Sequence, residues 1–415
     1  MSYCINRAVS ISSDPFDPNG KPYAGNPHVR FDEGEAASTA TSRRGSLLYN
    51  LPRRDFLKCS LSALGLAALG ASHVFAAPMG SLLPTMNRVG DRASVPASSS
   101  SLRVGSYNVR VGTADGKTAN AWDNRKEDLV ALMRLIDYDV VGLQESFTAQ
   151  SAYITNSLPG YALIGSIEGA EENVGVTSPI CYRKARLTPL KSGTFWLSTT
   201  PDAPGGDVWG AWSRRKVCVW ALLEDRVTGK TLCFVNTHTD HKSEVARLEG
   251  TKLILRRVAE IVPAGMPIVF TGDHNCRETE APSQAVMKVL KNALYVSETP
   301  PSGPWRSYSG WKWREKEYSA VDALKLPADV RNARKGSPDA DRDADGRHKW
   351  ENCGARIDYI YVSDGVKVKS YATRADSRSG TKLYPSDHFP LVAEIELSQT
   401  PNGHGGMKGQ SLLIQ

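Results

Sequence analysis

Apolar residues recur along the middle and C-terminal parts of the chain with the periods of regular secondary structure. Residues 102–109 (LRVGSYNV) and 138–145 (YDVVGLQE) are short apolar runs that predict buried strands. Between them, residues 124–137 repeat apolar positions at helical spacing and predict a helix. Further strands are predicted at 179–183, 193–197, 266–272, 356–362 and 391–397.

A hairpin and a second helix complete the pattern. Residues 216–237 hold two apolar runs around EDRVTGK and predict an antiparallel hairpin. Ser243 is a favourable N-cap, and the apolar spacing after it predicts a helix. Short strands joined by both hairpins and helices predict a layered α/β or α+β domain. We expect it to span residues 102–398, with an irregular charged insertion at 311–355 and a C-terminal tail at 399–415.

The first hundred residues do not continue this pattern. Residues 1–51 are rich in Ser, Asp, Pro, Gly and Asn and are expected to be disordered. Residues 52–77 hold the pair Arg53-Arg54 and then an uncharged apolar stretch, too short for a spanning helix. This anatomy predicts a twin-arginine signal peptide, followed by a linker at 78–101. We therefore expect twin-arginine machinery to export the chain to the periplasm or the medium, with no stable membrane span.

Charge and cysteine content exclude several classes of protein. The 415 residues include 51 Lys and Arg against 44 Asp and Glu, a net charge of +7. That surplus suits an anionic substrate but not a dedicated nucleic-acid binder, which needs a dense basic stripe. The seven cysteines show no CxxC spacing, so neither a zinc cluster nor a disulfide framework is predicted. We expect a monomer.

Several apolar strands end in polar side chains that can bind metal or phosphate. The residues concerned are Asn108, Glu145, Asn236, His238, Asp273, Asn275, Asp358, Asp387 and His388. Open sheets collect ligands at such edges, so we expect these side chains to gather at one site. Carboxylate and amide oxygens are the ligands of hard divalent cations, which favours Mg²⁺ or Mn²⁺. No HExxH motif or G-x-S-x-G elbow is present, so a metal-assisted phosphoryl hydrolysis fits this inventory best.

The order of the motifs resembles that of one enzyme superfamily. The segments SYNVR, VVGLQE, CYRK, VNTHTDH, GDHN, RIDYIYV and SDHFPL follow one another as in the endonuclease/exonuclease/phosphatase superfamily. The segment FWLSTTP (195–201) resembles the corresponding segment in the exported bacterial branch of this superfamily. The resemblance covers about residues 102–397 and implies a four-layer α/β sandwich, two packed mixed sheets flanked by helices.

The resemblance also implies a role for each site residue. Glu145 would be the principal metal ligand, with Asn108 beside it on the metal or the phosphate. Asp273 would bind metal or activate water, and Asp387 would be a further metal or water partner. Asn275, His238 and Lys216 would contact the phosphate. His388 would be catalytic, and Asp358 would orient its ring. Asn236 is either a substrate contact or a turn former.

Three positions depart from the family pattern. His274 replaces an apolar residue, Val176 replaces a Glu that partners the central His, and Lys216 replaces an Arg. The predicted function is an exported, Mg²⁺- or Mn²⁺-dependent phosphohydrolase that cleaves phosphodiesters, nucleic acid included. The alternatives are a phosphomonoesterase, a phospholipid or sugar-phosphate hydrolase, and a catalytically weakened binding module.

Overall fold

The computed structural model describes residues 86–87, 100–165, 178–203, 207–210, 216–314, 317–333, 353–378 and 381–398. The predicted disordered segment, signal peptide and C-terminal tail lie outside these residues. So do most of the predicted linker and residues 334–352 of the insertion. In the parts that are described, no helix combines the length and the apolar character needed to cross a membrane.

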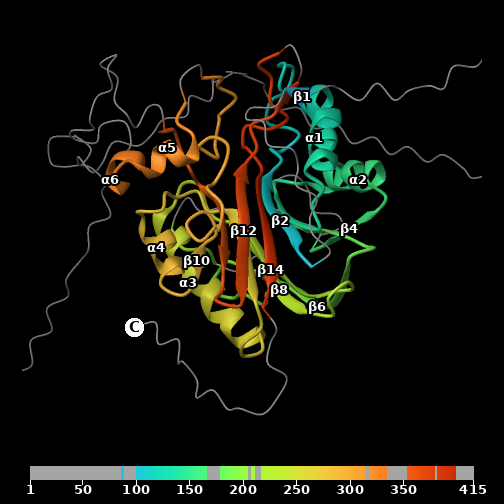
Figure 1. Ribbon diagram of the computed structural model, residues 1–415, viewed down its shortest axis with the longest axis vertical. Coiled ribbons are helices and arrows are strands. Elements are labelled where there is room, and N and C mark those ends of the chain that lie inside the picture. The colour runs from blue at the N-terminus through green and yellow to red at the C-terminus, as the bar shows by residue number, and fades with distance from the viewer. Residues whose placement is uncertain are drawn as a thin grey trace, which may run out of the picture. The chain divides into compact units, whose positions relative to one another are not determined.

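The described residues form two six-stranded sheets (Figure 1). The first has the order β10 (Lys291–Asn292), β11 (Asp358–Val362), β9 (Ile268–Asp273), β8 (Thr231–His238), β7 (Val217–Asp225), β6 (Leu187–Trp196). The second has the order β12 (Val366–Thr373), β14 (Leu391–Leu397), β2 (Leu102–Asn108), β3 (Val140–Gln144), β5 (Ile180–Arg183), β4 (Tyr161–Ile164). A small third sheet pairs β1 (Met86–Asn87) with β13 (Ser377–Arg378).

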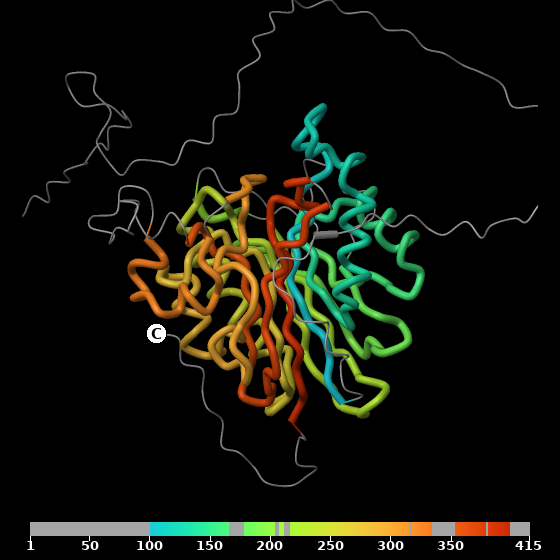
Figure 2. Tube along the Cα trace, turned by 45° about the horizontal axis from the view of Figure 1, so that its top comes forward, coloured from blue at the N-terminus to red at the C-terminus, as the bar shows by residue number. Residues whose placement is uncertain are grey.

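Both large sheets are mixed. β2 runs parallel to β3, and β8 runs parallel to β9, whereas the other neighbours are antiparallel. The first long strand, β2, pairs with the last, β14, and Figure 2 shows these two ends of the domain lying side by side. The carboxyl ends of β2 and β3 therefore meet at one edge of their sheet, as do those of β8 and β9 in the other.

Three apolar clusters hold the layers together. The first lies between the sheets and includes Val104, Val219, Phe234 and Ile395, all fully buried. The second packs α3 (Glu244–Ile261) and α4 (Ala281–Met287) on the β8–β9 sheet, and the third packs α1 (Trp122–Ile136) and α2 (Thr148–Ser157) on the β2–β3 sheet. Figure 1 shows the two helix pairs on opposite sides of the sheets. Each buried Val, Leu or Phe contributes about 1.5–3 kcal/mol.

The expected layered fold is confirmed, together with the hairpin, now β7 and β8, and the two predicted helices, α1 and α3. Ser243 caps α3 as predicted, because its Oγ accepts a hydrogen bond from the backbone N–H of Ala246 (3.1 Å). The structure adds β4, β12 and α2, which the sequence patterns did not predict. It also places two short helices in the insertion, α5 (Ala320–Leu324) and α6 (Ala328–Arg331).

The cysteines of the described part of the chain lie inside the domain. Its five cysteines are free thiols, and all five are buried, including Cys218 and Cys233. Burial raises the pKa of Cys233 to about 12, so this thiol stays protonated at neutral pH. These residues act as small apolar packing groups.

Candidate active site

The polar strand ends of both sheets meet at one place, and Asn108 lies at its centre. Asn108 ends β2, and its Nδ2 donates hydrogen bonds to Glu145 Oε1 (3.1 Å) and to Asp273 Oδ2 (3.0 Å). Glu145 follows β3 in the same sheet, whereas Asp273 ends β9 in the other sheet. The side-chain oxygen of Asn108 accepts the backbone N–H of Arg110 (2.9 Å). Asn108 therefore links two carboxylates from opposite sheets.

Glu145 is held in place by its own backbone and by the segment after β2. Its φ of 57° is a left-handed conformation that costs a non-glycine residue on the order of 1–3 kcal/mol and is characteristic of functional sites. Its Oε2 accepts the backbone N–H of Val111 (2.8 Å). Burial raises the pKa of the carboxyl, but the Val111 N–H and the Arg110 charge outweigh it, so the pKa lies below its ordinary value. Glu145 is therefore an ionised carboxylate held in a fixed position.

Asp273, Asn275 and His238 form the second part of the site. Asp273 Oδ1 accepts the Asn275 N–H (2.9 Å), and Asn275 also has a positive φ of 47°. Asn275 Nδ2 donates to His238 Nε2 (2.9 Å), which lies 3.4 Å from Asp273 Oδ2. Burial and then the nearby Asp358 charge raise the pKa of Asp273 to about 7. Such mutual destabilisation of buried carboxylates is relieved by a cation between them.

His388 and Asp358 form a buried pair. His388 Nδ1 donates to Asp358 Oδ2 (2.8 Å), and its Nε2 then faces Asp273 Oδ2 at 3.7 Å. Burial lowers the pKa of His388, but Asp358 and then Asp273 overcome this effect and raise it to about 10. The imidazole is thus positively charged at neutral pH, with its ring orientation fixed by Asp358.

Two overlapping groups of side chains could hold a divalent cation. They are Glu145 with His238 and Asp273, and Asp273 with Asp358 and His388, and within each group the ligand atoms all lie within 4.8 Å of one another. Asp358 Oδ1 is also buried without a hydrogen-bond partner among the described residues. A set rich in carboxylate oxygens fits Mg²⁺ or Mn²⁺ better than zinc.

Asp387 and Lys216 lie at the margin of this cluster. Asp387 belongs to neither candidate metal group in the described chain, and its Oδ2 is 3.6 Å from an Arg110 guanidinium nitrogen. Lys216 is buried beside β7. Burial, and then the charge of Lys216, holds the pKa of His238 well below its ordinary range. Lys216 therefore acts at the site through its charge, next to a neutral His238.

The expected substrate contact at Asn236 is wrong. Its side chain lies between the sheets, where Nδ2 donates to the carbonyl oxygens of Leu143 (2.9 Å) and Ser178 (2.9 Å). Its Oδ1 accepts from Gln144 Nε2 (2.8 Å) and from Thr271 Oγ1 (3.1 Å). With both amide hydrogens and both lone pairs used in a fully buried position, Asn236 fastens one sheet to the other and cannot reach a substrate.

Two residues at the site were given no role by the sequence. Arg110, within the quoted motif SYNVR, has a φ of 56° and directs its guanidinium toward Asp387 and Asp115. Tyr308 comes from the segment before the insertion, and its ring centroid is 4.9 Å from that of His388. The basic position two residues after Asn108 was a usable signal for Arg110. No pattern marked Tyr308, because it lies outside any periodic segment.

His274 is packed as a neutral imidazole among aromatic rings. It is fully buried, with ring centroids 5.0 Å from Phe270, 5.6 Å from Tyr359 and 5.4 Å from Tyr361. Neither ring nitrogen has a hydrogen-bond partner among the residues that the structure describes. Burial lowers its pKa to about 4. The ring therefore occupies the apolar position of the family pattern without adding a polar contact to the site.

We expect His274→Phe to raise the free energy of unfolding by about 1–3 kcal/mol, because phenylalanine keeps the packing and removes two buried polar atoms. Denaturant unfolding at pH 7 measures this. The His274 pKa near 4 in the folded protein lies below the ordinary value of 6.5, so the unfolded chain binds more protons between pH 4 and pH 6.5. The wild-type free energy of unfolding is therefore unaffected by this titration above pH 6.5 and falls by on the order of 3 kcal/mol as the pH drops to 4. The variant's gain should therefore grow on acidification, and a constant gain would contradict this account.

This fold and this group of side chains define a class of proteins, the two-sheet hydrolases of phosphate esters. The chain belongs to the Endonuclease/Exonuclease/phosphatase family, whose model matches residues 105–388. Members of this family are hydrolases that act on phosphate esters.

Solved structures of similar proteins agree with the family. A family member from Bacteroides vulgatus is 28% identical, with a TM-score of 0.58 over 72% of this chain and 99% of its own. The mannosyl-6-phosphatase of Bacteroides thetaiotaomicron is 26% identical, with a TM-score of 0.56 over 71% of this chain and 99% of its own. Nocturnin of Drosophila melanogaster is 23% identical over 355 residues. That match covers 77% of this chain, which spans about half the length of that relative (50%).

Proposed function

We propose that this chain is a divalent-metal-dependent hydrolase of phosphate esters, and that Glu145 and Asp273 hold the metal. The observation that carries this proposal is the hydrogen-bonded link from Glu145 through Asn108 to Asp273. It fixes two carboxylates from different sheets at a spacing that one cation can bridge. A bound Mg²⁺ or Mn²⁺ would supply Lewis-acid polarisation of a phosphoryl oxygen.

The chain's own residues would position the reactants. Asn275 and the neutral His238 lie beside Asp273, and the positive charge of Lys216 near His238 favours an anionic substrate there. Asp273 can accept a proton from an attacking water, and the charged His388, whose Nε2 is 3.7 Å from Asp273 Oδ2, can stabilise negative charge beside it. Asp358 keeps the His388 ring in the required orientation. General acid–base assistance of this kind contributes about 10²- to 10⁴-fold.

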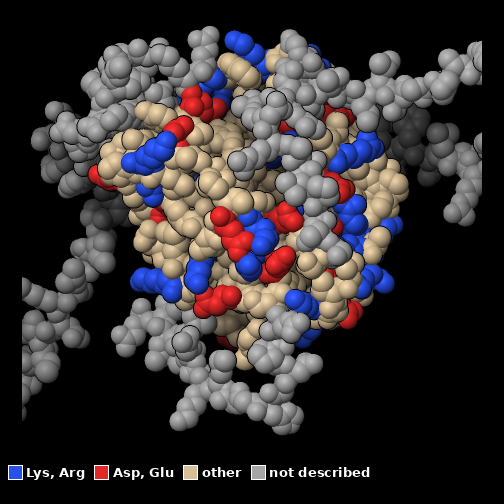
Figure 3. Space-filling model, in the orientation of Figure 1, with Lys and Arg blue, Asp and Glu red and all other residues tan. Residues whose placement is uncertain are grey.

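Phosphodiesters and phosphomonoesters are the two candidate substrates. The sequence favoured phosphodiesters, nucleic acid included. A nucleic-acid groove needs basic side chains that are available to phosphates, but Arg331 of the insertion is tied to the buried Glu278 (3.0 Å), and Figure 3 shows acidic and basic side chains intermingled on one face. Likeness to a mannosyl-6-phosphatase supports phosphomonoesters of small molecules. We therefore propose small phosphomonoesters first and phosphodiesters second.

Export remains part of the proposal. The twin-arginine pair and apolar stretch at 52–77 support passage to the periplasm or medium, ahead of a catalytic domain at 102–398.

A catalytically weakened binding module is the alternative to an enzyme. The segment with Val176, which replaces the expected Glu partner of His238, lies outside the described residues, and His238 Nδ1 is buried without a hydrogen-bond partner among those described. A non-catalytic module is the outcome to exclude.

Removal of divalent metal tests the proposal directly. We expect the purified protein to hydrolyse at least one ester from a panel of a hexose phosphate, a nucleoside monophosphate, glycerol phosphate, plasmid DNA and sphingomyelin. A chelator should abolish that turnover, and added Mg²⁺ or Mn²⁺ should restore it, because several kcal/mol of transition-state stabilisation come from the cation. Released phosphate and gel mobility are the readouts. Turnover that persists in excess chelator would contradict metal dependence, and no turnover of any ester would favour the binding module.

A further inference from the structure

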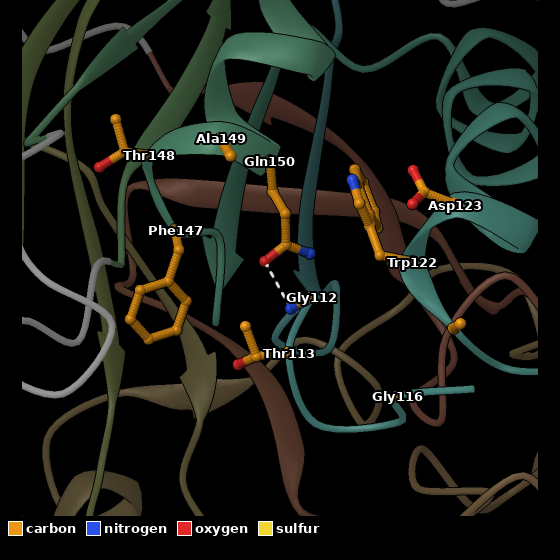
Figure 4. Close-up of a pocket in the computed structure, with 10 residues that line it drawn as sticks. Gly112, Thr113, Gly116, Trp122, Asp123, Phe147, Thr148, Ala149 and Gln150 are labelled. Carbon is orange, nitrogen blue, oxygen red and sulfur yellow. Dashed lines mark hydrogen bonds between the residues drawn. The ribbon is translucent and has the colours of Figure 1, made fainter. Parts of the chain in front are cut away.

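A cavity of about 370 Å³ opens beside Glu145 and takes no part in the chemistry described above. It lies at the lower end of the roughly 300–1,000 Å³ range of small-molecule sites. Its walls come from the segment after β2, the start of α1 and the start of α2. In Figure 4, Trp122 and Phe147 stand on opposite sides of Gln150, with Thr113 below them. Two aromatic rings thus flank a space of limited size.

The same two segments that hold Glu145 form this cavity. Val111, whose N–H binds the Glu145 carboxylate, is followed at once by the lining residue Gly112, and Phe147 comes two residues after Glu145. At about 3.5 Å per residue, the cavity wall begins within about 7 Å of backbone from the carboxylate's holders. The cavity wall is therefore close to the carboxylate proposed to hold the metal, and this proximity is the ground for placing the attached group of the substrate in the cavity.

The walls of the cavity are fixed in the structure. Gln150 Oε1 accepts the Gly112 N–H (2.9 Å), and its Nε2 donates to the Arg110 carbonyl (2.8 Å), so both ends of its amide are engaged. The Trp122 ring is held by the Arg125 guanidinium, 5.1 Å from its centroid, and by Tyr153 edge-on at 5.8 Å. A wall that is already ordered loses little entropy when a ligand binds to it.

The charge of the lining selects the kind of group. Among the described residues that line the cavity there is no Lys or Arg, and the one charged side chain is Asp123, paired with Lys126 (2.6 Å). A second phosphate would find no cation here, so a polynucleotide backbone is disfavoured. Aromatic faces bind flat or ring-shaped groups, and the Thr113 and Thr148 hydroxyls can hydrogen-bond a neutral polar ligand.

We propose that this cavity binds an uncharged, ring-shaped leaving group of the phosphate ester, a sugar or a nucleoside. The inference rests on the proposed function, because it assumes that the phosphate is held at Glu145 and Asp273. It adds the class of substrate, a small phosphate ester with one neutral ring, and it assigns Trp122 and Phe147 to substrate recognition.

Filling the cavity tests this assignment. Ala149 is exposed, lines the cavity and lies in the first turn of α2, so Ala149→Trp should fold normally and occupy the space. Ala152→Trp is the matched control, since Ala152 is exposed on the same helix but does not line the cavity. We expect Ala149→Trp to lower kcat/KM about 10- to 100-fold for whichever of a hexose 6-phosphate and a nucleoside 5′-monophosphate fits the cavity. Glycerol phosphate, which lacks a ring, should change by no more than about 2-fold.

A binding measurement keeps the inference separate from the proposed chemistry. Saturation-transfer NMR with a methyl hexoside and with adenosine, both free of phosphate, should show binding to the wild type that Ala149→Trp removes. If no ester is hydrolysed but this signal is present and lost in the variant, the proposed function and the leaving-group role fail, whereas the cavity remains a binding site for a neutral ring. Equal loss of activity on ring-bearing and ringless esters, no loss on either, or no ring binding to the wild type would overturn the assignment. The ring compound that responds distinguishes sugar from nucleoside.

Discussion

We expect Glu145→Gln to lower metal-dependent turnover about 10³-fold while leaving the fold intact. The substitution preserves the size of the side chain and its capacity to accept the Val111 N–H, but it removes the negative charge that a cation requires. Loss of several kcal/mol of electrostatic stabilisation corresponds to a fall in kcat/KM of about 10³-fold. Initial rates at saturating Mg²⁺ or Mn²⁺, with metal affinity from calorimetry, measure the effect.

The control for this variant is Glu249→Gln, which removes a carboxylate from a surface pair with Lys252. That pair contributes at most about 1 kcal/mol to stability, so the control should keep wild-type rates. Circular dichroism should give the same spectrum for both variants. Wild-type turnover by Glu145→Gln, with unchanged metal affinity, would remove Glu145 from the metal site.

The second large effect is expected at the buried pair of Asp358 and His388. Asp358→Asn removes the carboxylate that accepts the His388 Nδ1–H, so the imidazole loses both its fixed ring orientation and its charge partner. We expect kcat/KM to fall about 10²- to 10⁴-fold, the range of assisted proton transfer. His388→Gln should have an effect of similar size. Steady-state kinetics on the ester found by the substrate panel measures both.

The double variant distinguishes a functional pair from two independent residues. If Asp358 acts only through His388, the combined substitution should be no worse than His388→Gln alone, because groups that act as a unit are strongly non-additive. Multiplicative losses would show that Asp358 acts separately, for example as a metal ligand through its second oxygen. Asp322→Asn is the matched control, because Asp322 is an exposed carboxylate that accepts a hydrogen bond from the Ser319 hydroxyl. This variant should leave the rate unchanged.

Local patterns in the sequence predicted the layers and most of the strands because these elements bury continuous apolar faces. β12 was missed although it is an eight-residue strand, because a register shift between Val368 and Ser370 interrupts its alternation. β4 is a four-residue edge strand whose residues are all half-buried, which gives little periodicity. α2 was missed because it has only three buried residues and thus no apolar stripe.

The sequence predicted the site residues that directly follow a strand. It did not predict the positions of side chains that depend on packing between distant segments. Glu145, Asp273 and His388 were expected together, and the structure brings them together. The position of Asn236 between the sheets depends on Gly142, because a Cβ at residue 142 would overlap the Asn236 amide. Such a long-range fit of one small residue against another side chain leaves no periodic signal in the sequence. The same holds for Tyr308, whose contact with His388 joins segments that are 80 residues apart.

The pairing of β2 with β14 also affects how this domain is made. Strand Leu102–Asn108 cannot complete its sheet until Leu391–Leu397 has been synthesised, almost 290 residues later. Closing so long a loop before its contacts form makes folding slow, since folding rates fall as contacts become less local. His388 lies just before that last strand, so the proposed site can assemble only after the chain has been synthesised through residue 397. Until its first and last strands have joined, the domain therefore lacks a complete set of the side chains proposed to act on phosphate esters.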